Sequence, residues 1–215
     1  MKTINTDVVI VGGGLAGIYT ALNIDSSKRV DIIVKEDLID TNSRLAQGGI
    51  AGELTINTQN IEAHINDTLQ AGSFLNNEAA VRVLVSEASE NIQKLMEFNV
   101  AFDRDKDGNF LLTKEGGHST RRILHAGGDS TGNDIMSALR IECKNRTNIT
   151  IHEETMALEL IQHNNFCYGV SCLSIEKEIV YFIANNTVLA TGGIGNIYGS
   201  TTNSTSATAD GIGLA

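Results

Sequence analysis

The chain has 215 residues, of which 41% are hydrophobic and 20% charged, enough for a sizeable core and unlike a disordered, collagenous or coiled-coil protein. Its formal net charge of −10 argues against a nucleic-acid-binding or anionic-membrane surface. No segment approaches the ~20 apolar residues of a membrane-spanning helix, the N-terminus lacks a signal-peptide pattern, and the histidines have no metal-ligand spacing. We therefore expect a cytoplasmic protein with free thiols and no metal site, membrane partner or nucleic-acid partner.

The first 35 residues predict a βαβ unit. Val8–Val11 is a short apolar run ending in glycine, which is typical of a buried parallel strand. A helix is predicted from Leu15 to about Ser26, and a second strand at Val30–Val34. Residues 36–56 are expected to form a glycine-rich loop with a short strand around Ile50.

Amphipathic helices are predicted in the middle of the chain, because apolar residues recur there at helical spacing. The expected elements are helices at 57–71, 76–98 and 133–144 and short strands at 100–102 and 110–112. Thr131 is expected to cap the third helix. Asp103–Gly108 matches the start of a calcium-binding EF-hand loop, but Lys114 stands where Ca²⁺ needs a bidentate Glu, so we predict a charged hairpin turn instead.

The last third predicts strands and the start of one more helix. The expected strands are 149–152, 156–161, 168–174, 180–183 and 187–190, with a β-meander over 155–183. Residues 209–215 have the pattern of a first helical turn without a stop signal, so we expect truncation there. The alternation of strands and helices predicts an α/β, Rossmann-like fold with a parallel sheet and a β-meander.

Gly12–Gly17 is a G-x-G-x-x-G motif that follows a predicted strand and opens a predicted helix, the context in which the motif binds dinucleotides. Gly12 permits the tight turn, Gly14 lets the backbone approach a pyrophosphate, and Gly17 lets helix and strand pack closely. The phosphates would lie at the helix N-terminus, where free N–H groups favour anions.

The end of the second predicted strand lacks the usual ribose-binding acid. Val34 stands at that position and is followed by Lys35 and Glu36. A lysine beside a dinucleotide suggests a phosphate contact, and a simply solvated Lys35 is the alternative.

Three further glycine-containing motifs indicate places where the backbone approaches a ligand. Asn42–Ile50 ends in Gly-Gly and offers backbone N–H groups. Thr113–Arg122 places a carboxylate, an imidazole, hydroxyls and two guanidiniums around Gly-Gly; from spacing alone a small-molecule site and a charged surface loop are equally supported. Val188–Gly195 predicts a buried strand ending in Ala-Thr-Gly-Gly.

Taken in order, these motifs resemble the succinate dehydrogenase/fumarate reductase flavoprotein superfamily over residues 5–215, and within it the L-aspartate oxidase branch. The segments that carry the resemblance are Gly12–Gly17, Ala46–Gly49, Glu115–Ser119, Arg121–Ala126, Ala190–Gly193 and Asp210–Gly211. The resemblance implies that residues 1–215 are the N-terminal portion of an FAD-binding domain, truncated before the remainder of that domain, the capping domain and a C-terminal helical domain.

Two positions select the branch. Membrane-bound members carry a histidine that holds FAD covalently where this chain has Asn42, so the resemblance implies noncovalent FAD. Glu115 stands where aspartate oxidases carry a glutamate that meets the substrate's amino group, which succinate and fumarate lack.

The resemblance, together with the glycine motifs, implies the following FAD contacts: Gly12, Gly13, Gly14, Leu15, Ala16, Gly17, Lys35, Asn42, Ser43, Arg44, Leu45, Ala46, Gln47, Gly48, Gly49, Met156, Ala157, Thr191, Gly192 and Asp210. The implied catalytic or substrate residues are Glu115, His118 and Ser119.

The implied reaction moves a hydride from the Cα of L-aspartate to FAD and yields iminoaspartate, with oxygen or fumarate as electron acceptor. It is the first step of de novo NAD biosynthesis and feeds a quinolinate synthase. The family's catalytic arginine and carboxylate-binding residues lie in later segments, so this chain alone is expected to be inactive. The alternatives are a soluble fumarate reductase and a non-catalytic FAD-binding fragment.

Overall fold

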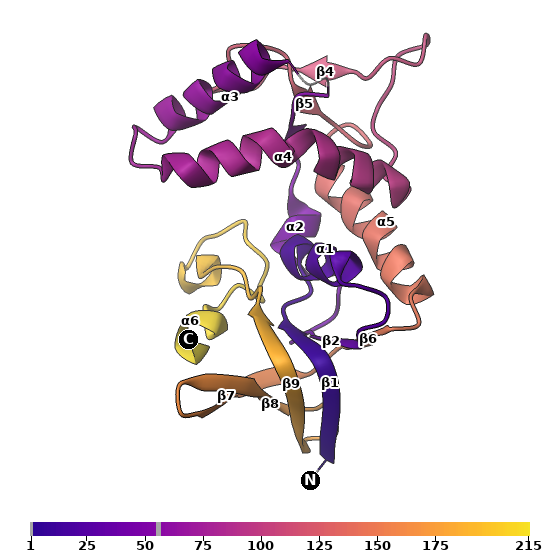
Figure 1. Cartoon of the computed structure of the whole chain (residues 1–215), viewed down its shortest axis with the longest axis vertical. Helices are drawn as coiled ribbons and strands as arrows, with labels where there is room; N and C mark the ends of the chain where they lie inside the picture. The colour runs from indigo at the N-terminus through magenta and orange to yellow at the C-terminus, as the bar shows by residue number, and fades with distance from the viewer. Residues whose placement is uncertain (1, 55–56) are drawn as a thin grey trace. The chain divides into compact units, whose positions relative to one another are not determined.

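The computed structural model describes residues 2–54 and 57–215, which form two compact units (Figure 1). The first unit contains the chain up to Leu45 together with Leu139–Ala215, and the second contains Ala46–Ala138. The predicted loop at 36–56 reaches residues 55 and 56, which lie outside the described part of the chain.

The first unit is built on a six-stranded sheet with the order β6-β2-β1-β9-β8-β7. Its strands are β1 (Lys2–Val11), β2 (Val30–Ile33), β6 (Ile149–His152), β7 (Met156–His163), β8 (Phe166–Leu173) and β9 (Ile179–Leu189). The pairs β6–β2, β2–β1 and β1–β9 are parallel, and the pairs β9–β8 and β8–β7 are antiparallel. The predicted parallel sheet and β-meander are therefore confirmed, and both belong to one sheet.

One long strand, β9, replaces the two strands predicted at 180–183 and 187–190, so that division is wrong. The sequence suggested a break because Asn185 and Asn186 are poor strand formers. Both are exposed, and the strand continues through them because its register with β1 pairs Val8 with Asn186.

The helices of the first unit position the ends of these strands. They are α1 (Leu15–Asn23), α2 (Asn42–Leu45), the 3₁₀ turn η1 (Gly195–Ile197), α6 (Asp210–Leu214) and the second part of α5 (Thr131–Asn145). Helix α1 buries Ile18, Ala21 and Leu22, as its predicted amphipathic pattern requires. The sheet core contains Val9, Val11, Ile33, Val170, Cys172, Val180, Phe182 and Ala184.

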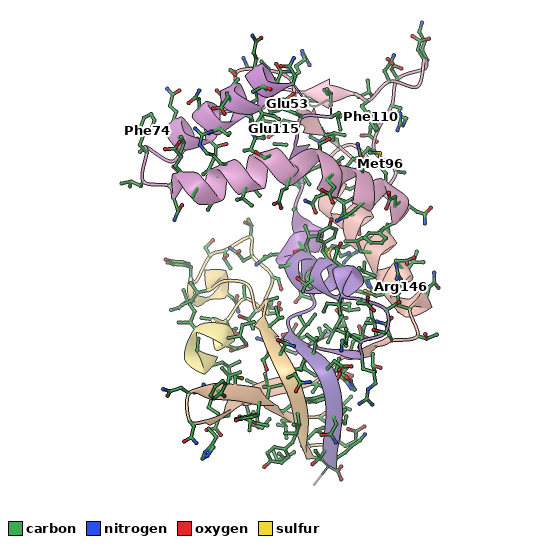
Figure 2. All side chains as sticks on the ribbon, viewed as in Figure 1. Glu53, Phe74, Met96, Phe110, Glu115 and Arg146 are labelled. Atoms are coloured by element: carbon green, nitrogen blue, oxygen red, sulfur yellow. The ribbon has the colours of Figure 1, made fainter. Side chains whose placement is uncertain are left out.

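The second unit consists of a helical hairpin, a small sheet and the first part of α5. The hairpin helices are α3 (Thr58–Ala71) and α4 (Glu78–Glu97), and the sheet has the order β3 (Ile50–Ala51), β5 (Ile123–Leu124), β4 (Leu112–Thr113). Both hairpin helices begin after an asparagine cap: Asn57 accepts from the N–H groups of the first turn of α3, and Asn77 does so for α4. Phe74, in the turn between these helices, points outward (Figure 2) and is 72% exposed.

Two predictions in the second unit are wrong. The strand expected at 100–102 does not form; Val100 and Phe102 are both buried, so their alternation reflects packing without strand pairing. Thr131 is not a cap but the first residue of α5, and its hydroxyl accepts from the N–H of Ala126 at 3.3 Å.

The charged hairpin turn predicted at Asp103–Gly108 is confirmed. Arg104 and Phe110 form an antiparallel bridge across it. Asp105 Oδ1 accepts from the backbone N–H groups of Asp107 and Asn109, both at 2.9 Å, so this carboxylate stabilises the turn itself. Within the described residues, no helix is long and apolar enough to cross a membrane.

Candidate cofactor cavity and substrate loop

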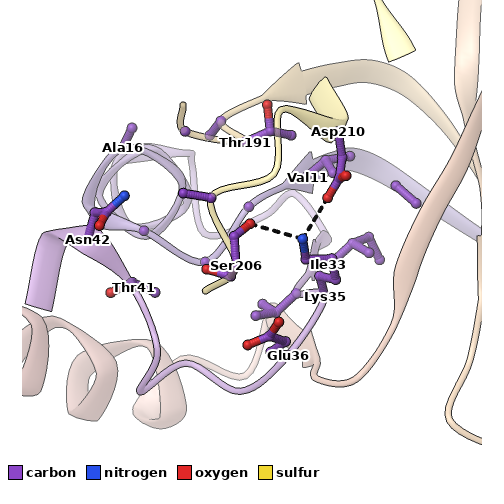
Figure 3. Close-up of a pocket in the computed structure, with 18 of the residues that line it drawn as sticks. Val11, Ala16, Ile33, Lys35, Glu36, Thr41, Asn42, Thr191, Ser206 and Asp210 are labelled. Atoms are coloured by element: carbon purple, nitrogen blue, oxygen red, sulfur yellow. Dashed lines mark hydrogen bonds and ion pairs between the residues drawn. The ribbon is translucent and has the colours of Figure 1, made fainter. Parts of the chain in front are cut away.

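A cavity of about 360 Å³ lies in the first unit at the carboxyl ends of β1, β2 and β9 (Figure 3). Ligands of doubly wound α/β folds bind at this edge, where crossovers leave a central strand in opposite directions. The lining segments are 11–16, 33–37, 40–43, 155–157, 189–193, 206–207, 210 and 214.

The turn after β1 requires glycine, as the motif predicts. Gly12 has φ +123°, and a side chain there would overlap the carbonyl oxygen of Ala190. A side chain at Gly17 would overlap the carbonyl oxygen of Gly12, so this glycine allows α1 to pack against the turn. A Cβ on Gly13 would come within 2.6 Å of Leu38. The backbone of Gly12–Gly17 therefore forms a hollow, here called the glycine cradle, which does not accommodate a side chain at Gly12, Gly13 or Gly17.

The N-terminus of α1 opens into this cavity and favours an anion. Gly14 caps the helix in extended conformation without a side-chain hydrogen bond, and the first turn holds no acidic residue. The N–H of Leu15 donates to Ser43 Oγ at 3.0 Å, which brings a hydroxyl beside the helix end. Free N–H groups and the helix dipole both attract phosphate at such a site.

Most of the predicted cofactor contacts in the first unit line this cavity. Those that do are Gly12, Gly13, Gly14, Leu15, Ala16, Lys35, Asn42, Ser43, Met156, Ala157, Thr191, Gly192 and Asp210. Gly17, Arg44 and Leu45 belong to the same unit but do not line it. Ala46, Gln47, Gly48 and Gly49 belong to the second unit.

The segment 204–209, which precedes the predicted contact Asp210, belongs to a wall of the cavity that the motif analysis missed, and its Ser206 and Ala207 line the cavity. Ser206 Oγ donates to the carbonyl of Asp40 at 3.1 Å, and Thr205 Oγ1 donates to Asp40 Oδ2 at 2.7 Å. The N–H of Ser204 donates to Asn42 Oδ1 at 2.8 Å. The only sequence signal is the dense run of Ser, Thr and Asn before Asp210.

Three acidic groups on this cavity have shifted pKa values. Burial, followed by a hydrogen bond with Asp40, raises the pKa of Glu36. Hydrogen bonds from the side chains of Thr205 and Ser204 lower the pKa of Asp40. The hydrogen bond from Lys35 is the largest cause that lowers the pKa of Asp210. The cavity therefore carries its own charges at fixed positions.

A second cavity, of about 570 Å³, lies within the second unit and contains Glu115. Its lining is Gln47, Gly48, Asp103, Leu111, Thr113, Glu115, His125, Gly128 and Asp129. The Glu115 side chain is 50% exposed, and its Oε1 lies 3.7 Å from His125 Nε2. Thr113 Oγ1 lies 2.8 Å from the same His125 nitrogen and fixes the ring. Glu115, labelled in Figure 2, thus shares a cavity with part of the predicted flavin-contact loop.

His118 and Ser119, the other predicted catalytic residues, are not among the residues that line this cavity. Ser119 donates from both its N–H and its hydroxyl to Asp67 Oδ2, each at 2.7 Å. His118 Nδ1 accepts from Arg122 at 3.1 Å, because a guanidinium only donates. Both side chains contribute to a network around Arg122.

Arg122 is completely buried and binds two carboxylates, Glu53 at 2.8 Å and Asp67 at 2.6 Å. Its remaining contacts are Thr120 Oγ1 at 2.7 Å and the His118 ring. Burial alone would raise the pKa of Asp67, but hydrogen bonds from Ser119 and Arg122 lower it to about 2. Arg122, with His118 and Ser119, therefore anchors this loop to Glu53 and Asp67.

The parallel sheet, the glycine cradle and the open helix N-terminus define a dinucleotide-binding protein. Residues 7–215 match the family model described as FAD binding domain, and the chain belongs to that family. FAD is accordingly its cofactor.

Curated relatives are L-aspartate oxidases from bacteria and plants. The enzyme of Clostridium acetobutylicum is 39% identical over 212 residues, covering 99% of this chain and 48% of the relative. That of Neisseria meningitidis is 42% identical over 210 residues, covering 97% and 41%. The chloroplastic enzyme of Arabidopsis thaliana is 39% identical over 214 residues, covering 97% and 33%. The chain thus spans a third to a half of these relatives.

Solved structures of a quinol fumarate reductase and of an Sdh1 complex share the fold. The FrdA subunit of an E. coli quinol fumarate reductase variant superposes with a TM-score of 0.93 at 26% identity, covering all of this chain and 37% of that one. A Mycobacterium smegmatis Sdh1 complex gives 0.90 at 31% identity, covering 100% and 39%.

Proposed function

We propose that this chain is the FAD-binding part of an L-aspartate oxidase, which oxidises L-aspartate to iminoaspartate and passes the electrons to oxygen or fumarate. The observation that carries the proposal is the position of Glu115, whose half-exposed carboxylate shares a cavity with Gln47 and Gly48. Identities of about 40% to aspartate oxidases along nearly the whole chain support it. The product would enter de novo NAD biosynthesis and serve a quinolinate synthase.

The first cavity fits FAD on two structural grounds: its turn excludes side chains, and Gly14, which caps the helix, has no side chain to occupy the helix end. The backbone of Gly12–Ala16 would hold the pyrophosphate, and Thr191, Gly192 and Asp210 would contact other parts of the cofactor. When bound, FAD supplies the acceptor for the hydride. The cofactor would be noncovalent, because an amide stands at Asn42 and its oxygen is already hydrogen-bonded to Ser204.

Glu115 would bind the α-ammonium group of the substrate. A carboxylate and an ammonium form a charge-assisted hydrogen bond, which fixes the Cα that loses the hydride. His125 lies beside Glu115 and is held by Thr113, so it would orient the carboxylate. Asp103 is less available, since it accepts from the N–H groups of Gly127 and Gly128 at 3.0 Å each.

The two carboxylates of aspartate need cationic partners that this cavity does not provide. None of its lining residues is Lys or Arg. Arg122 is buried and engaged with Glu53 and Asp67, so it is not available to the substrate. We therefore propose that the 215-residue chain alone has little or no oxidase activity, because transition-state charges would lack stabilising groups.

The function is tested by the flavin spectrum of the purified chain and by turnover of the full-length protein. The chain should show flavin absorption bands after incubation with FAD and produce almost no hydrogen peroxide from L-aspartate. In the full-length protein, Glu115→Gln should lower kcat/KM for L-aspartate roughly 10- to 100-fold, the cost of one charge-assisted hydrogen bond, and leave fumarate reduction nearly unchanged.

A soluble fumarate reductase is the second candidate, favoured by the close superposition on the fumarate reductase subunit. It predicts that the full-length protein reduces fumarate with an external donor but does not oxidise L-aspartate. Equal loss of both activities in Glu115→Gln would contradict the assigned role of this carboxylate, because fumarate has no ammonium group to bind.

A further inference from the structure

The Lys35 ammonium group, directly after β2, is fully engaged by one segment of the cavity wall. Its Nζ lies 2.9 Å from the carbonyl oxygen of Ser206, 2.6 Å from Thr208 Oγ1 and 2.7 Å from Asp210 Oδ2. Figure 3 shows the contacts with Ser206 and Asp210. An ammonium has three N–H donors, so each already has an acceptor and none remains for a phosphate.

The ion pair between Lys35 and Asp210 is partly shielded from solvent. The side chains are 25% and 33% exposed, respectively. Thr208 Oγ1 also lies 2.9 Å from both carboxylate oxygens of Asp210. The carboxylate is therefore held from two directions, and Thr208 connects the two charges.

Packing holds only part of the segment that Lys35 contacts, because Ala207 is buried whereas Thr208 is exposed. Thr208 and Asp210 are largely polar and partly exposed, and Ala209 between them has a left-handed φ of +66°. Such a conformation is unfavourable in a residue other than glycine, so surrounding contacts must stabilise it. The N–H of Ala209 donates to Gly193 O at 3.2 Å, which joins this segment to the glycine turn after β9.

Asp40 and Asn42 anchor the other end of this segment, at Ser204–Ser206. The backbone of Gly193 and the residue Asn196 also hold this segment, so Lys35 is one of several anchors and contributes a positive charge. Ser206, Ala207 and Asp210 of this wall line the cavity. Without it, the half that carries Asp210 would have no charged contact with the sheet. Lys35 therefore has a structural role that a cation would lack if it only neutralised the negative charge of a bound cofactor.

We propose that Lys35 is a positioning residue: its ammonium fixes the 206–210 wall and the Asp210 carboxylate at the FAD cavity and does not bind the cofactor's phosphates. The inference rests on the proposed cofactor function of this cavity and replaces the phosphate contact suggested by the sequence. Because Lys35 also lines the cavity, its methylene groups remain free to touch FAD.

Hydrogen–deuterium exchange of the 215-residue chain without any ligand tests the proposal. In Lys35→Met and in Asp210→Ala, the amides of Ala209 and Ile212 should exchange roughly tenfold faster, as expected for loss of one charge-assisted hydrogen bond. The double variant should exchange less fast than the two single effects combined, since both variants remove the Lys35–Asp210 contact. Lys28→Met is the matched control, because Lys28 lies outside the cavity lining and is mostly exposed.

Amides of β9 serve as an internal reference, and their unchanged protection shows that a variant still folds. In Lys35→Met the affinity for FAD should fall. ADP has the pyrophosphate but no flavin ring, and the salt dependence of its affinity should be the same in Lys35→Met as in the unmodified chain. Unchanged exchange in Lys35→Met overturns the proposal, and a shallower salt dependence for ADP would identify Lys35 as a phosphate contact. If the unmodified chain binds no FAD, the proposed function fails while the exchange result still decides the role of Lys35.

Discussion

Replacing Arg122 by Met should destabilise the second unit strongly. The guanidinium is fully buried, and its removal leaves the carboxylates of Glu53 and Asp67 nearly buried without their cation. Breaking a buried ion pair on one side costs about 3–5 kcal/mol. With a urea slope of about 2–3 kcal/mol per M, the unfolding midpoint should fall by about 1–2 M.

The matched control is Arg82→Met, because Arg82 also binds two carboxylates, Glu62 and Glu78, but does so at the surface. Exposed pairs contribute about 0–1 kcal/mol, so the midpoint should hardly move. Urea unfolding followed by far-ultraviolet circular dichroism compares the two variants. The interpretation of Arg122 as the anchor of this loop would be refuted if both variants had the same midpoint.

The acid dependence of stability gives an independent measure of the same network. The pKa of Asp67 is lowered to about 2 in the folded chain from 3.8. A lowered carboxyl pKa contributes stability that is present above the unfolded pKa and is lost as pH falls through the folded one. Stability should therefore decline between about pH 4 and pH 2 in the unmodified chain, and this part of the decline should shrink in Arg122→Met.

Two further predictions concern the glycine cradle and the thiols. Gly12→Ala should abolish FAD binding measured by flavin fluorescence, because Gly12 has a left-handed φ and the new methyl group would overlap the Ala190 carbonyl. In the control Gly213→Ala the new methyl group meets no atom within 4 Å, so this variant should bind FAD normally. Equal binding by the two variants would show that the turn tolerates a side chain. At pH 8 a thiol reagent should modify only the exposed Cys167 in the folded chain and all three cysteines after denaturation, and rapid labelling of more than one thiol before denaturation would contradict the burial. Burial raises the pKa of the two unreactive thiols to about 12: Cys143 and Cys172.

The sequence predicted the parts of the site that depend on local backbone chemistry. Gly12 and Gly17 can be assigned without a structure, because a tight turn and a close helix–strand contact each require a missing side chain. The β-meander was equally predictable from strands separated by polar turns. These features depend on residues that are close together in the chain.

Features that depend on distant partners were not predictable in the same way. Nothing near Ser206 indicates that Asp40 holds it, because no periodic pattern connects two loops so far apart in the chain. His118 and Ser119 have the chemistry of ligand-binding residues, and only the folded network shows that His118 accepts from the buried Arg122 while Ser119 donates to Asp67. The acceptors of Lys35 in the segment 206–210 likewise lie far along the chain, so the sequence alone does not indicate them.

The pairing of β1 with β9 also has a consequence for biosynthesis. Lys2 is registered with Val180, so β1 acquires β9 as its second neighbour only after about 180 residues have been synthesised. Ala46–Ala138 is continuous and can form its own contacts earlier. During translation the edge of β1 that faces β9 therefore keeps its backbone N–H and C=O groups unpaired for a long period, which slows completion of the sheet and leaves the nascent chain prone to incorrect strand pairing.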